Sequence, residues 1–127
     1  MNFEFIRDID GLNRAFDSCS NAEELAISMP DLSMIASRKS AEVLAKFVYL
    51  VSHSAEAEDM SFADILSNDI VKRYLNNRNV LEAFHFIRKN GNIAVHTLES
   101  KTLNDSLKVL KNLHFAFGEV AKRMRLI

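Results

Sequence analysis

Apolar residues recur with helical periodicity along most of the chain. The clearest predicted helix covers Asp31–Ser52, with Pro30 in its first turn and Ser28 as its cap. Its predicted core face consists of Leu32, Ala36, Val43, Leu44, Phe47, Leu50 and Val51. Arg38 and Glu42 fall on the opposite face, and we therefore expect them to be solvated.

A second long helix is predicted from a capping pattern at Thr102 to about Arg125. Its predicted core face consists of Leu103, Leu107, Leu110, Leu113, Phe117, Val120 and Ala121. Part of Ile6–Ile27 is also helical in pattern, either as one helix or as two pieces with the second capped by Asn21. Shorter helical patterns cover Ser61–Leu66, Asp69–Leu75, Val80–Asn90 and, beyond an interruption at Gly91, residues up to Leu98.

The fold class follows from these segments, because none of them has a convincing strand pattern. We predict an all-α bundle of four to six helices with the two long helices at its centre. Three Gly and one Pro leave little room for the many turns of a sandwich or barrel. The length of 127 residues suits one domain. We expect residues 1–127 to form a single helical domain, alone or as the amino-terminal module of a longer chain.

Composition and charge narrow the function classes. The formal net charge of −1 argues against a strongly basic, non-specific nucleic-acid binder. Cys19 is the only cysteine, so an internal disulfide and a cysteine-based zinc site are excluded, which favours the cytoplasm. The longest apolar run, Phe47–Val51, is too short to cross a membrane. The sequence has no P-loop and no paired-histidine metal motif, so we predict no metal and no small-molecule cofactor.

A polar column is the most informative feature. If the helix continues through Gly91, then Arg88, Asn92 and His96 lie four residues apart along one edge, and Glu99 extends the column. A cation, an amide and an imidazole beside a core can hold a phosphate, but such groups more often satisfy each other. These three residues are therefore only candidate catalytic residues. If the Asn92 amide is buried and bonded, its loss should cost about 1–3 kcal/mol.

Two stretches resemble motifs of a known family. Ser37–Leu44 resembles the motif A-R-K-A-x-E-x-L, with serine at both alanine positions, and Ile87–His96 resembles I-R-x-x-G-N-x-A-x-H. In this order, they resemble the small helical domain of unknown function at the amino terminus of type I restriction enzyme R subunits. The same domain occurs in other bacterial defence proteins, including those of phage defence. The last helix also resembles the closing helix of the family, with Gly118 and Glu119 in place of a frequent aromatic pair.

The resemblance implies a HEPN-like bundle, a superfamily that includes metal-independent ribonucleases. Their motif is an Arg, usually followed by Asn, with a His four to six residues beyond. It corresponds here to Gly91, Asn92 and His96, so glycine replaces the arginine and Arg88 lies one turn earlier.

The resemblance therefore implies a non-catalytic accessory or assembly domain of a restriction–modification R subunit, which makes protein or nucleic-acid contacts. The alternative is a HEPN-type ribonuclease or toxin that uses His96 as the base and Arg88 as the cation. A longer parent chain would resemble a type I site-specific deoxyribonuclease.

A surface on the last helix is the second candidate. Phe115 points away from the predicted core of this helix, near Lys108, Lys111 and Lys122. An exposed aromatic ring among lysines suits a protein partner or self-association, and less strongly a nucleic acid. The alternative is that Phe115 covers another helix of the same bundle.

Overall fold

The computed structural model of the chain describes residues 2–96 and 103–127, without the side chains of residues 95 and 96. The described residues contain no strand, so the predicted all-α bundle is confirmed. Two 3-10 turns and six α-helices follow one another as η1 (Glu4–Ile6), η2 (Asn13–Ala15), α1 (Phe16–Ser28), α2 (Pro30–His53), α3 (Phe62–Ser67), α4 (Asp69–Leu75), α5 (Arg78–His96) and α6 (Leu103–Arg123).

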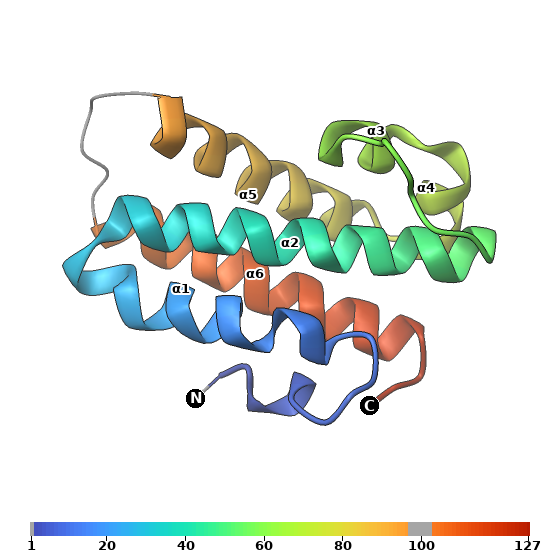
Figure 1. Cartoon of the computed structure of the whole chain (residues 1–127), viewed down its shortest axis with the longest axis horizontal. Coiled ribbons are helices and arrows are strands. Elements are labelled where there is room, and N and C mark those ends of the chain that lie inside the picture. The colour runs from blue at the N-terminus through green and yellow to red at the C-terminus, as the bar shows by residue number, and fades with distance from the viewer. Residues whose placement is uncertain (1, 97–102) are drawn as a thin grey trace.

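The two long helices, α2 and α6, hold the bundle together (Figure 1). Both pack against α1 and α5, and they also pack against each other. The short helices α3 and α4 lie against α2 near its carboxyl-terminal end, and α3 also contacts α5. None of the described helices is long and apolar enough to cross a membrane.

Several predicted helix limits shift in the structure. α1 is continuous through Asn21, so the two-piece interpretation is wrong. Ser28 ends α1 and Met29 takes the cap position of α2, while Pro30 occupies the first turn as predicted. α5 continues through Gly91 without interruption. The predicted capping residue Thr102 lies outside the described residues.

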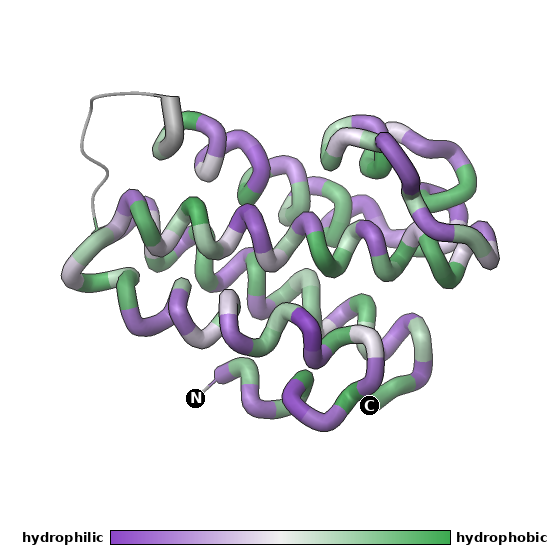
Figure 2. Tube along the Cα trace, in the orientation of Figure 1, coloured by the Kyte–Doolittle hydropathy of each residue, from purple (hydrophilic) through white to green (hydrophobic). Residues whose placement is uncertain are grey.

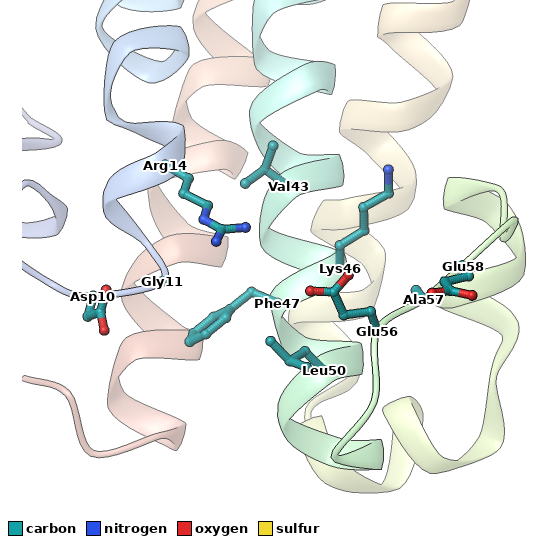
Figure 3. A pocket seen from close by; sticks show the side chains of 10 residues that line it. All are labelled: Asp10, Gly11, Arg14, Val43, Lys46, Phe47, Leu50, Glu56, Ala57 and Glu58. Carbon is teal, nitrogen blue, oxygen red and sulfur yellow. The ribbon is translucent and has the colours of Figure 1, made fainter.

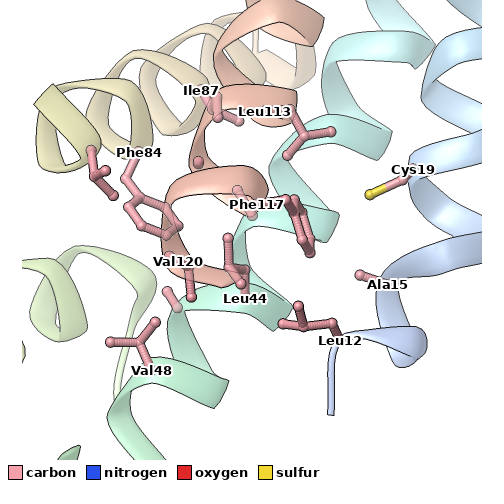
Figure 4. Packing of buried hydrophobic residues seen from close by; sticks show 14 of the residues in the cluster. Leu12, Ala15, Cys19, Leu44, Val48, Phe84, Ile87, Leu113, Phe117 and Val120 are labelled. Atoms are coloured by element: carbon pink, nitrogen blue, oxygen red, sulfur yellow. The ribbon is translucent and has the colours of Figure 1, made fainter. Parts of the chain in front are cut away.

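The core is built from large apolar side chains of every long helix (Figure 4). Leu44 of α2, Ile87 of α5 and Phe117 of α6 are almost completely buried. The amino-terminal turns join this core through Phe3, which contacts the ring of Phe117 edge-on with 6.2 Å between ring centres. Along the tube in Figure 2, hydrophobic segments accordingly alternate with polar ones on each helix.

The buried face of α2 differs from the predicted one. Leu32, Leu50 and Val51 are exposed, whereas Ser33 and Ser37 are fully buried. Hydropathy misplaced this face because its central positions are small residues, which let neighbouring helices approach closely. Ser33 also bonds across helices, since its hydroxyl donates to the Ala22 carbonyl of α1 at 2.6 Å, whereas the buried Ser37 hydroxyl has no partner among the described residues.

At the start of α6, too, a serine lies in the core where leucines were predicted. Leu103 and Leu107, both predicted as core, are exposed, and Ser106 is fully buried between them. The Ser106 hydroxyl donates to the Ala26 carbonyl of α1 at 2.7 Å. In a continuing helix this carbonyl would accept from the residue four positions on, but that residue is Pro30, which has no N–H. Ser106 therefore supplies the hydrogen bond that Pro30 cannot.

Candidate functional site on α5

Helix α5 carries Arg88 and Asn92 of the predicted polar column on one unbroken helix. Its amino terminus is fixed by Asn77, whose side-chain oxygen accepts from the Val80 backbone N–H at 3.2 Å. Val80, Phe84 and Ile87 anchor its apolar face in the core. Since the helix continues through Gly91, Arg88 and Asn92 do lie on successive turns, as the column requires.

Gly91 itself is buried against α2. A side-chain carbon added at Gly91 would lie 2.5 Å from the Cβ and 2.8 Å from the Cδ of Arg38. Arg38 was predicted to face solvent, but it crosses the α2–α5 contact at the point where α5 has no side chain. The cause is the small residue at position 91, whose missing Cβ leaves room for the stem of a long side chain.

The Arg38 guanidinium has only loose partners. It lies 3.4 Å from a Glu42 carboxylate oxygen and 5.8 Å from the centre of the Phe62 ring. Glu42 is shared with Lys46, also at 3.4 Å, and both distances exceed those of a tight charge-assisted hydrogen bond. The Arg38 Nε is buried and has no hydrogen-bond partner among the described residues.

Among the described residues of the column, Arg88 and Asn92 form no hydrogen bond with each other. Asn92 is half-buried, and its amide forms no hydrogen bond to the described residues. Arg88 is also half-buried, and its Nε is buried without a partner in the described part of the chain. The side chain of His96 and the whole of Glu99 lie outside the described residues, so the structure places Arg88, Gly91 and Asn92 but not the full column.

His85, one turn before Arg88, was not predicted as a site residue. Partial burial lowers its pKa, and the nearby cations Arg88, Lys89 and Lys72 lower it further. The spacing of His85, Arg88 and Lys89 was visible in the sequence as an i, i+3, i+4 set. Lys72 belongs to α4, and only the fold brings it to this histidine.

The second predicted surface is present on α6 as one exposed stripe. Lys108, Lys111, Phe115 and Lys122 are all exposed, and the Phe115 side chain is 38% accessible. Phe115 therefore faces solvent rather than covering another helix completely. Lys122 lies 3.6 Å from Glu119, so part of the positive charge of the stripe is compensated within the helix.

A hollow of about 650 Å³ lies between the η1–η2 segment, α2 and the loop after α2 (Figure 3). Val43, Phe47 and Leu50 form its apolar side. Figure 3 shows Arg14 extending into it from the amino-terminal segment, and acidic residues line it as well. Periodicity did not predict this hollow, because Phe47 was assigned to the core and the amino-terminal segment was expected to be helical.

The structure also bears on two other kinds of chemistry, a reactive cysteine and a metal site. Burial raises the pKa of the Cys19 thiol to about 12, so this cysteine stays protonated and unreactive at neutral pH. No group of three metal-ligating side chains occurs in the part of the chain that the structure describes.

No family model matches the chain, and comparisons with curated proteins and with solved structures find no match either.

Proposed function

We propose that the chain is a non-catalytic accessory and assembly domain, as its resemblance to the amino-terminal domain of type I restriction R subunits implies. The observation that carries the proposal is a group of exposed apolar side chains at one end of the bundle. There α1 turns into α2 and α6 begins (Figure 1). We call this group the apolar end, and its members are Ile27, Met29, Leu32, Leu103 and Leu107.

The apolar end favours a protein partner over a nucleic acid. Ile27 is 76% exposed, and four other large apolar side chains are exposed at the same end of the bundle. A single exposed apolar residue is common on protein surfaces, but a group of this kind indicates a contact with another protein. A second copy of the chain is the simplest partner, because an apolar patch can face its own copy across a twofold axis without matching charges.

Sedimentation velocity over a range of concentrations tests this assembly. We expect the wild type to dimerise with rising concentration, and Ile27→Glu with Leu107→Glu to remain a monomer. Ile70→Glu is the matched control, because Ile70 is 44% exposed on α4, away from the apolar end. A wild type that stays monomeric at the highest concentration, or a control that dissociates as readily as the double variant, contradicts the proposal.

A HEPN-type metal-independent ribonuclease is the second candidate, and one observation favours it. The side-chain stem of Arg38 from α2 lies against Gly91, the position at which the related ribonucleases carry their arginine, and its guanidinium lies 3.4 Å from a Glu42 oxygen. The positive charge needed for a developing phosphorane could thus come from another helix.

Labelled RNA incubated with the protein distinguishes the two candidates. The assembly proposal predicts intact RNA. The enzyme candidate predicts cleavage that disappears in His96→Ala and in Arg38→Gln but persists in Arg78→Gln. Arg78 is a fully solvated arginine at the start of the same helix, paired with Glu82 at 3.1 Å.

A further inference from the structure

Positive side chains gather around His85, about two turns into α5. Arg88 and Lys89 follow His85 by three and four residues, so they share its side of α5. Lys72 of α4 is near enough to this imidazole to act on it electrostatically. Two helices therefore direct three cations and one histidine to a single surface.

This cluster lacks the carboxylates that usually balance such charge. Among the described residues, Lys72, Arg88 and Lys89 form no salt bridge, although the chain as a whole has a net charge of −1. The acidic residue nearest in sequence on α5, Glu82, is committed to Arg78. The charge excess is therefore local, and it attracts anions.

Arg88 adds a guanidinium to the cluster from a half-buried position. Its Nε is buried and has no hydrogen-bond partner among the described residues, so an anion in solvent can approach only the Nη end of this group. Guanidinium groups bind phosphate especially well, because their planar donors match two phosphate oxygens at once.

We propose that Lys72, His85, Arg88 and Lys89 form a binding site for a phosphate group, carried either by a nucleic-acid strand or by a small phosphate compound. Lysine and arginine provide charge and directed donors, and the imidazole donates once phosphate has favoured its protonated form. The site does not depend on the proposed assembly, because α4 lies at the opposite end of the bundle from the α1–α2 turn (Figure 1).

Two probes test the site at low salt: inorganic phosphate followed by NMR at the His85 imidazole, and a short fluorescent single-stranded RNA followed by anisotropy. We expect both to bind the wild type. The double variant Lys72→Gln with Lys89→Gln, whose positions are exposed and leave the core intact, should bind each probe about tenfold more weakly. Arg88→Gln should weaken binding as well, with thermal melting used to check that it folds.

The matched control is Lys39→Gln with Arg125→Gln, which removes two exposed cations, one from α2 and one from the carboxyl-terminal segment. It should bind both probes like the wild type. If the RNA binds more tightly than phosphate through the His85 cluster, the site serves nucleic acid; if both bind equally, it serves a small phosphate compound. The proposal is overturned if phosphate does not move the His85 signals, or if the control weakens RNA binding as much as Lys72→Gln with Lys89→Gln does.

Discussion

Arg38 of α2 lies across Gly91 of α5, and the contact begins at the Arg38 Cβ rather than at the flexible end of its side chain. A side-chain carbon at position 91 would meet an atom that cannot move without shifting the α2 backbone. We therefore expect Gly91→Ala to lower the free energy of unfolding by about 1–3 kcal/mol, the usual cost of overpacking a helix contact.

Gly118→Ala is the control for this substitution. Gly118 lies inside α6, and a side-chain carbon there would have no neighbour within 4 Å. Replacing a helical glycine in open space should stabilise the protein by about 0.5–1 kcal/mol through helix propensity alone. Chemical denaturation of both variants measures the contrast, and equal effects of the two substitutions would argue against the close α2–α5 contact.

The Ser106 hydroxyl is predicted to be a significant source of stability. Ser106→Ala leaves the Ala26 carbonyl without a donor, because Pro30 cannot provide one. The cost should be about 1–3 kcal/mol, as for other buried acceptors left unpaired. Ser67→Ala should change stability little, since the Ser67 hydroxyl is exposed and bonds only to Ala63 in its own helix. Denaturation midpoints that shift equally in both variants would contradict this role of Ser106.

Asn92→Ala has a smaller expected effect than the sequence suggested. The cost of about 1–3 kcal/mol applied to a buried and bonded amide, but the half-buried Asn92 amide forms no hydrogen bond to the described residues. We now expect a change within about 0.5 kcal/mol, typical of a surface substitution. A large drop in the melting temperature of Asn92→Ala would instead indicate that the Asn92 amide is buried and hydrogen-bonded.

The fold was largely predictable because helical periodicity extends over most of the chain. The limits of α4 agree with the prediction, and the Ser61 cap of α3 was predicted from its capping pattern, since short polar side chains mark helix starts. The orientation of α2 about its own axis was not predictable from hydropathy. Its core positions are serines such as Ser33 and Ser37, and exposed leucines such as Leu32 mislead an apolar count.

The candidate site was predictable only where its residues belong to one helix. Arg88 and Asn92 could be placed from their spacing, given a helix continuous through Gly91. The approach of Arg38 to Gly91 joins α2 to α5, and that of Lys72 to His85 joins α4 to α5. Contacts between helices depend on how the helices pack, which a single sequence does not specify. The spacing of residues along α5 therefore did not predict that Arg38 lies at Gly91 or that Lys72 lies near His85.

The pH dependence of stability should reflect His85. Because burial and the cations Arg88, Lys89 and Lys72 lower its pKa in the folded protein, the unfolded chain binds more protons between the two pKa values. The stability contribution is therefore complete above the ordinary pKa of 6.5 and is lost as the pH falls toward the folded value. Urea denaturation across this range should show a smaller loss of stability at low pH in His85→Gln than in the wild type.

An NMR titration of the His85 imidazole tests the physical cause of this shift. Its midpoint should lie below 6.5 in the wild type and rise toward that value in Lys89→Gln, because removing a neighbouring cation makes protonation easier. Lys39→Gln is the control, since Lys39 is an exposed lysine of α2 that does not act on His85. A wild-type midpoint at or above 6.5 would mean that the cations do not surround the imidazole. A shift of equal size in both variants would mean that the pKa of His85 responds to the net charge of the protein rather than to its neighbouring cations. A midpoint that moves only in Lys89→Gln would locate the positive field at this face of α5, where it acts on the imidazole in the absence of any ligand.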